Sequence, residues 1–213
     1  MPKAACTPGR PARTPILINS RKALLFAADH PSILFLMTLG VLKEAHPETR
    51  VSLVPEIAAA LQKAGVTVRV ESGAGAQAFH DDAAYAAAGA TIVSRAEVLS
   101  EAQVVLAIHP FEEVGSLPNG AVLIGVYNPL QEPHRAASFA EKGLTVFSLD
   151  MLPRTTRAQS MDVLSSQANI AGYKAVLLAA ASYSRYFPMF MTAAGSIPPA
   201  KVLIIGAGVA GLQ

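Results

Sequence analysis

The sequence predicts an α/β protein built on a parallel β-sheet. Short apolar runs such as TVRVE and AVLIGV recur along the chain and have the length of buried strands. Alanine-rich or amphipathic segments alternate with these runs, and several of them end at a glycine, a residue that often terminates helices. This alternation is typical of a parallel sheet whose two faces are covered by helices.

Each element follows from a local pattern. Strands are expected at 38–42, 67–71, 91–93, 104–108, 121–126 and 144–149, where apolar residues are concentrated. Helices are expected from Pro55 to Gly65, over 81–88 and over 132–143; proline is well tolerated in a first helical turn. A polar loop at 150–162 precedes a long helix expected over 165–187, which Pro188 ends.

The pattern changes after this helix and indicates a domain boundary. Residues 192–201 are a turn-rich connector with two adjacent prolines, and residues 202–205 predict a further buried strand. We therefore expect an N-terminal α/β domain (37–164), a long helix and linker (165–199) and the start of a second domain (200–213). Residues 1–36 are expected to be a poorly ordered extension, because the regular pattern begins at Met37.

Composition excludes several classes of function. Outside residues 1–36 the chain carries twelve basic and fourteen acidic residues, so a nucleic acid is not an expected partner. The single Cys6 suits a reducing compartment and cannot form an internal disulfide. No metal is expected, because the histidines lack ligand spacing, and no stretch reaches the ~18 apolar residues of a membrane span.

Two stretches indicate chemistry, and the first is GAGVAG. Gly206, Gly208 and Gly211 follow the expected strand in the spacing G-x-G-x-x-G, with Val209 and Ala210 between them. In dinucleotide-binding βαβ units this spacing allows a tight turn and lets backbone N–H groups approach a pyrophosphate. The alternative is an ordinary strand-to-helix turn. A second G-x-G, within residues 73–79, lacks the third glycine, so a structural turn is favoured there over an anion site.

The second stretch is PRTTRAQSMDVLSS, a polar loop that leads into the long helix. Its arginines, Gln159 and Asp162 could donate to and accept from a phosphate or an amide. Equally, Asp162 or Ser165 could be a helix N-cap beside solvated arginines. The residues alone leave both interpretations open.

The segment from 153 to 213, with PRTTRAQSMDVLSSQANIAGYKAVLLAA and FPMFMTAAGSIPPAKVLIIGAGVAGLQ, resembles the alpha subunit of proton-translocating NAD(P) transhydrogenase. Upstream, GVLKEAHPETRVSLVPE and VRVESGAGAQAFHDDAAYAAAGATIV resemble segments that these subunits share with alanine dehydrogenases. The resemblance covers roughly residues 37–213. It implies a Rossmann-like first domain, a long connecting helix and the start of an incomplete Rossmann NAD-binding domain.

The resemblance also implies roles for individual residues. Arg154, Gln159 and Asp162 match a family loop at the nicotinamide of NAD(H): Arg154 contacts the phosphates or carboxamide, Asp162 accepts from the carboxamide, and Gln159 points toward the NADP(H)-bearing partner. Ser165 adds a hydrogen bond to the carboxamide. Five positions would form the pyrophosphate loop: Gly206, Gly208, Val209, Ala210 and Gly211. Arg50 keeps the position of a family arginine that can hold a substrate carboxylate.

The implied function is direct hydride transfer from NADH to NADP⁺, coupled to proton translocation in the intact complex. The cofactors are NAD(H) on this chain and NADP(H) on a partner subunit. Expected partners are the membrane and NADP(H)-binding subunits and a second copy of the chain. The expected location is cytoplasmic, peripheral to the inner membrane through those partners.

The chain departs from the family in two respects. Ala107 stands where alanine dehydrogenases, and often transhydrogenases, have a lysine, and Tyr127 and Asn128 lie near the position of the dehydrogenase histidine. Without that lysine and histidine no proton relay for amino-acid oxidation is evident, which disfavours an amino-acid dehydrogenase. The sequence also ends at Gln213, before the acid expected to bind the ribose, so we expect a truncated piece that is inactive alone. An alanine dehydrogenase-like enzyme and a non-enzymatic, partner-binding fragment remain the alternatives.

Overall fold

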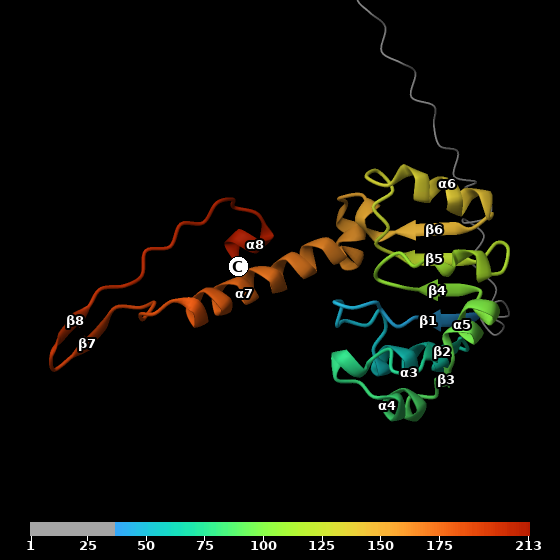
Figure 1. Cartoon of the computed structure of the whole chain (residues 1–213), viewed down its shortest axis with the longest axis horizontal. Helices are drawn as coiled ribbons and strands as arrows, with labels where there is room; N and C mark the ends of the chain where they lie inside the picture. The colour runs from blue at the N-terminus through green and yellow to red at the C-terminus, as the bar shows by residue number, and fades with distance from the viewer. Residues whose placement is uncertain (1–36) are drawn as a thin grey trace, which may run out of the picture.

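The computed structural model describes residues 37–213, and a six-stranded parallel sheet lies at one end of it (Figure 1). Expectations for residues 1–36 lie outside the described residues. The strand order is β3-β2-β1-β4-β5-β6, the order of the doubly wound dinucleotide-binding fold. The strands are β1 (Thr38–Val41), β2 (Thr67–Glu71), β3 (Thr91–Val93), β4 (Val104–Leu106), β5 (Val122–Gly125) and β6 (Thr145–Ser148). The predicted fold class and all six predicted strands of this sheet are therefore confirmed.

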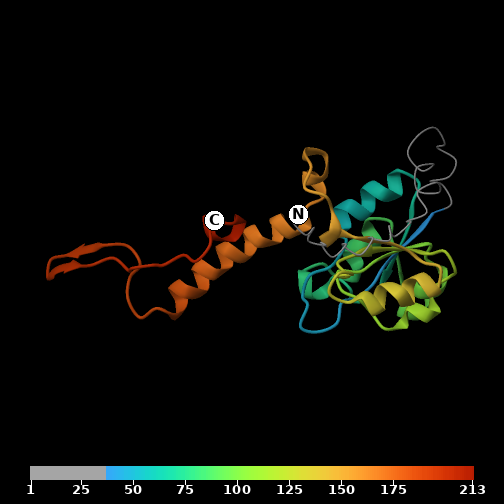
Figure 2. The same cartoon turned by 90° about the horizontal axis from the view of Figure 1, so that it is seen from above.

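Helices cover both faces of this sheet (Figure 2). One apolar cluster joins one face to two helices, α3 (Pro55–Lys63) and α4 (Asp82–Ala87). The other cluster joins the opposite face to α5 (Arg95–Glu101) and α6 (Pro133–Glu141). Four short 3₁₀ helices lie in three of the connections: η2 (Ala76–Ala78), η3 (Glu113–Ser116), and η4 (Leu149–Met151) with η5 (Thr156–Met161) between β6 and α7.

The central strand β1 shows why both faces are buried. Leu39 and Val41 belong to the cluster beneath α3 and α4. Gly40, between them, faces α5 so closely that an added Cβ would lie 2.6 Å from Cγ1 of Val98. Alternate residues of a strand point to opposite faces, so this glycine allows α5 to pack directly on the backbone of the sheet.

The chain leaves the sheet through one long helix, α7 (Val163–Ser182). An antiparallel hairpin follows at its far end, formed by β7 (Phe190–Thr192) and β8 (Gly195–Ile197) (Figure 1). The predicted helix 165–187 exists but ends five residues earlier, and the predicted connector 192–201 contains strand β8.

The predicted buried strand at 202–205 is wrong. These residues form no regular element and are exposed; Ile205 is 92% exposed. A strand needs a neighbouring strand to satisfy its backbone groups, and the described residues place none beside this segment. The short helix α8 (Val209–Leu212) follows and packs against the middle of α7.

Candidate functional site

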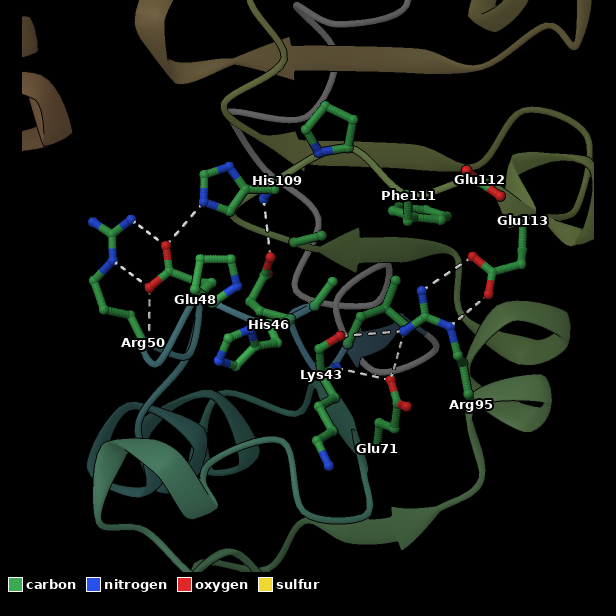
Figure 3. Close-up of a pocket in the computed structure, with 16 residues that line it drawn as sticks. Lys43, His46, Glu48, Arg50, Glu71, Arg95, His109, Phe111, Glu112 and Glu113 are labelled. Carbon is green, nitrogen blue, oxygen red and sulfur yellow. Dashed lines mark hydrogen bonds and ion pairs between the residues drawn. The ribbon is translucent and has the colours of Figure 1, made fainter.

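The main cavity of the described residues lies at the carboxyl edge of the sheet (Figure 3). Its volume is about 1010 Å³, and residues that follow β1 and β4 supply most of its wall. The strand order reverses between β1 and β4, and open α/β sheets bind their ligands outside the carboxyl ends of the strands at this point. The lining residues that matter below are Lys43, Glu48, Arg50, Glu71, Arg95 and His109.

Glu48 is the centre of one side-chain network in this wall. Its carboxylate accepts hydrogen bonds from Nε and Nη2 of Arg50, at 2.8 and 2.5 Å, and from the Arg50 backbone N–H at 2.9 Å. The same carboxylate lies 2.9 Å from Nε2 of His109, which comes from the loop after β4. The hydrogen bonds from Arg50 hold the pKa of Glu48 far below its ordinary value of 4.5, so this carboxylate is ionised at neutral pH.

Arg95 is the centre of a second network on the opposite wall. Its guanidinium contacts Glu71 at 3.0 Å and Glu113 at 2.9 Å, and it donates to the backbone carbonyl of Lys43 at 3.2 Å. Glu71 is the last residue of β2, Glu113 is the first residue of η3, and Lys43 lies in the loop after β1. One arginine therefore connects three segments of the cavity wall. Both arginines are thus already paired with carboxylates of the chain itself.

The glycine-rich turn at 73–79 is a structural turn, as the sequence favoured. The carboxylate of Asp82 accepts from Ser72 Oγ and from the backbone N–H of Gly73, both at 2.8 Å. A side chain of the protein therefore occupies the donors that an external anion would need. Gly75 also packs closely, because an added Cβ would lie 2.6 Å from the ring of Tyr85.

The polar loop before α7 contains the residues that the sequence assigned to the nicotinamide. Asp162 is the N-cap of α7 and accepts from the Ser165 backbone N–H at 3.0 Å and from Ser165 Oγ at 2.6 Å. These hydrogen bonds lower the pKa of Asp162. Arg154 and Gln159 are exposed on the adjoining loop. The N-cap geometry is what the helix-start interpretation predicted; a contact with a nicotinamide stays a prediction.

The glycine fingerprint forms a compact turn against α7. Gly206 has φ of 109°, and an added Cβ on Gly211 would lie 2.0 Å from the Gly206 carbonyl oxygen, so the turn requires glycine at both positions. Gly172 of α7 allows α8 to approach, because an added Cβ there would lie 2.3 Å from the Ala210 carbonyl oxygen. Space beside Gly208 is open.

The structure places both the polar loop and the glycine turn against α7, but at different positions along the helix axis. Asp162 begins the helix, and Gly172 lies ten residues further, about 15 Å along the axis at 1.5 Å per residue. Arg50 approaches neither group directly; its Nη1 donates to Oε1 of Gln167, at 2.7 Å, between the two.

Several residues of these networks were not predicted. Glu48, Arg95 and Gln167 were given no role, and His109 was considered only as one of the histidines that lack metal-ligand spacing. For Glu48, Arg95 and His109 the available signal is position, because polar residues in the loops after buried strands collect at the carboxyl edge of a parallel sheet. Gln167, within α7, has no such signal. Among the described residues, no group of three or more His, Cys, Asp or Glu side chains could hold a metal ion.

The strand order and a cavity at the reversal point define a doubly wound α/β domain of the nucleotide-binding class. Residues 40–171 match the model of the alanine dehydrogenase/PNT N-terminal domain, and residues 175–213 match that of the alanine dehydrogenase/PNT C-terminal domain. The chain belongs to the alanine dehydrogenase/PNT family.

Individual relatives divide into two groups. The first part of the NAD(P) transhydrogenase alpha subunit of Rhodospirillum rubrum is 44% identical over 186 residues, which cover 83% of this chain and 48% of the relative. The crystal structure of transhydrogenase from Sinorhizobium meliloti has a TM-score of 0.78 at 44% identity and covers 83% of this chain and 51% of that one. An L-alanine dehydrogenase structure reaches a TM-score of 0.70 at 28% identity, over 83% and 50% of the two chains. The chain thus spans about half the length of these relatives.

Proposed function

We propose that this chain is the NAD(H)-binding part of an NAD(P) transhydrogenase alpha subunit. In the intact complex, hydride passes directly from NADH to NADP⁺, and separate membrane subunits couple this transfer to proton translocation. The observation that carries the proposal is the start of α7, where Asp162 and Ser165 are locked together beside the exposed Arg154 and Gln159. Greater identity to a transhydrogenase subunit than to an alanine dehydrogenase supports it.

The hydrogen bonds at the start of α7 restrict what each residue can do. Asp162 is ionised, because its pKa is lowered by the hydrogen bonds from Ser165, and its oxygens have further lone pairs that can accept from a carboxamide N–H. Ser165 donates its hydroxyl proton to Asp162, so its oxygen acts toward a ligand as an acceptor. Both residues therefore present acceptors to the two N–H groups of a carboxamide.

Arg154 and Gln159 are the exposed residues of this loop to which we assign ligand and partner contacts. Arg154 supplies guanidinium donors for the cofactor's phosphates or carboxamide oxygen, and Gln159 faces the partner that carries NADP(H). Direct hydride transfer between two nicotinamides needs no protein acid or base, so these residues act by orientation and by excluding water. An orienting role explains why the loop contains no buried titratable group.

The glycine turn fits a dinucleotide pyrophosphate. The tight turn at Gly206 and Gly211 and the open space beside Gly208 let the backbone approach a phosphate without a Cβ between them. Gly206, Gly208, Val209, Ala210 and Gly211 would hold the pyrophosphate of NAD(H) with their backbone. The bound cofactor supplies the hydride.

An amino-acid dehydrogenase is the second candidate, because the cavity beside Arg50 could admit a small substrate. Its support is weaker, since Arg50 is engaged by Glu48 and Gln167, and the buried Ala107 offers no proton-transferring group. Oxidation of NADH that depends on pyruvate and ammonia would favour this candidate over transhydrogenation.

The proposed partners are the membrane and NADP(H)-binding subunits and a second copy of the chain, with peripheral attachment to the cytoplasmic side of the inner membrane. None of the helices in residues 37–213 has the length and apolarity needed to span a bilayer. Apolar side chains exposed along α7, among them Ile170, Tyr173 and Leu177, are available for subunit contacts. Sedimentation of the chain alone and with its partner subunits measures these associations.

The decisive experiment removes three polar side chains of this loop in the assembled enzyme. Arg154, Gln159 and Asp162 are replaced together by alanine, and hydride transfer from NADH to an NADP⁺ analogue of distinct absorbance is followed. Arg157→Ala is the matched control, because Arg157 is an exposed arginine of the same loop with no assigned role. We expect the triple variant to lose at least about 100-fold in rate and the control to keep the wild-type rate. An undiminished rate in the triple variant would refute the proposed function.

A further inference from the structure

One hydrogen bond joins α7 to the six-stranded domain. Among residues 37–213, the bond from Arg50 Nη1 to Gln167 Oε1, at 2.7 Å, is the one hydrogen bond that links the two, and its partners are 117 residues apart. Otherwise the helix is largely exposed, and of its residues Gly172 is the one that is buried. Helix α7 also packs near η4, directly after β6, so the hydrogen bond and this packing together set the direction of α7 relative to the sheet.

Hydrogen bonds within the sheet domain fix the orientation of the Arg50 side chain. Glu48 accepts from its Nε, its Nη2 and its backbone N–H, which fixes the guanidinium plane relative to the loop after β1. Glu48 also contacts His109 in the loop after β4, so the Arg50 side chain is held, through Glu48, by two loops of the sheet domain (Figure 3). The side chain of Glu48 is 12% exposed, whereas that of Arg50 is 46% exposed and points outward to the helix.

Gln167 accepts the hydrogen bond from Arg50 close to the loop that we assign to the nicotinamide. It lies five residues after Asp162 and two after Ser165, within the first two turns of α7. An α-helix is stiff over such a distance, so a constraint on Gln167 is also a constraint on Asp162 and Ser165.

We propose that Arg50 and Gln167 are positioning residues for hydride transfer. The contact between them sets the direction in which the first turn of α7 presents the Asp162 carboxylate and the Ser165 hydroxyl. This inference rests on the proposed function of the chain. It gives Arg50 a role that differs from holding a substrate carboxylate, because its Nε, Nη1 and Nη2 atoms already donate within the protein.

Loss of the contact should affect rate rather than cofactor affinity. Hydride transfer requires the two nicotinamides to meet in one orientation, and a misplacement of about 1 Å can cost about 100-fold. The glycine turn, which we assign to the pyrophosphate, packs on Gly172 and does not involve Gln167. We therefore expect kcat to fall while the KM for NADH stays nearly constant.

Three variants of the assembled transhydrogenase test the proposal. Gln167→Leu removes the acceptor at similar size, whereas Gln167→Glu keeps an acceptor for the Arg50 guanidinium. Lys174→Leu is the control, because Lys174 lies two turns further on the same side of α7 and makes no hydrogen bond to the sheet domain in the described residues. We expect Gln167→Leu to lower kcat about tenfold with less than a twofold change in KM for NADH. Gln167→Glu and Lys174→Leu should keep more than half of the wild-type kcat.

A second measurement on the 213-residue chain is independent of activity. Amide hydrogen exchange of residues 163–170 should be faster in Gln167→Leu and in Arg50→Gln than in the wild type, and unchanged in Lys174→Leu. Wild-type kinetics in Gln167→Leu, or equal losses in Gln167→Leu and Gln167→Glu, would overturn the positioning role. Such results would leave the proposed function intact, because that function stands or falls with the alanine variants of the polar loop.

Discussion

Removing the hydroxyl of Tyr127 is expected to stabilise the protein, whereas removing that of Tyr85 should destabilise it. Tyr127 is 2% exposed, and its Oη has no hydrogen-bond partner among the described residues. Burial raises the pKa of Tyr127, so its hydroxyl remains a neutral, unsatisfied donor. Tyr85 is 0% exposed, but its hydroxyl donates to the Leu53 carbonyl at 2.7 Å.

The two expected magnitudes follow from the cost of an unsatisfied polar group. Burying a donor or acceptor without a partner costs about 1–3 kcal/mol. Tyr127→Phe removes such a group and keeps the edge-to-face contact with Phe139, so the free energy of unfolding should rise by about 1 kcal/mol. Tyr85→Phe leaves the Leu53 carbonyl without this donor and should lower the free energy of unfolding by about 1–3 kcal/mol.

Urea denaturation followed by circular dichroism measures both variants against the wild type. The midpoints should move in opposite directions, with the slopes unchanged. In thermal unfolding, 1 kcal/mol corresponds to about 2–4 °C for a chain of this size. A loss of stability in Tyr127→Phe as large as that in Tyr85→Phe would mean that the Tyr127 hydroxyl has a partner, and the argument from its isolation would be refuted.

Three further predictions concern packing, capping and pH. Gly40→Ala should lower the free energy of unfolding by about 1–3 kcal/mol, because its Cβ would lie 2.6 Å from Val98 Cγ1; Gly115→Ala, with nothing within 4 Å, is the control in the same urea titration. Ser94→Ala should cost about 1 kcal/mol in thermal unfolding, because it removes the capping box of α5, and an unchanged midpoint would contradict that role. Glu48 has a lowered pKa in the folded state, so its stabilising contribution is present above pH 4.5 and is lost as the pH falls toward the folded-state value. Glu48→Gln should therefore show a shallower loss of stability than the wild type in acid titrations below pH 4.5, and an equal slope would exclude this contribution.

The sheet was predictable because its strands are local apolar signals. For β2 and β3 the predicted bounds, 67–71 and 91–93, are those of the structure. Helix α5 was missed although its start carries a clear signal, since the Ser94 and Glu97 side chains form a capping box. The run at 202–205 was mistaken for a buried strand because its apolar composition indicates only that these side chains favour burial. Formation of a strand also requires a neighbouring strand to pair with.

The candidate site was less predictable because its contacts are remote in sequence. The N-cap hydrogen bond between Asp162 and Ser165 joins residues three apart, so the sequence could suggest it. The sequence also allowed Asp162 to contact a ligand and did not decide between the two. The pairing of Arg50 with Gln167 spans 117 residues and depends on where α7 leaves the sheet. No local pattern encodes that direction, so the sequence could not show that the two residues meet.

The contacts of Arg50 also help to separate the two candidate functions. If Arg50 turned to hold a substrate carboxylate in the cavity, it would have to release Gln167 or Glu48. Release of Glu48 would leave a largely buried carboxylate, whose pKa the Arg50 hydrogen bonds keep low, with His109 as its remaining side-chain partner. Release of Gln167 would free the helix that carries Asp162 and Ser165. Holding a substrate and holding the helix therefore compete for one guanidinium, and the geometry favours the helix.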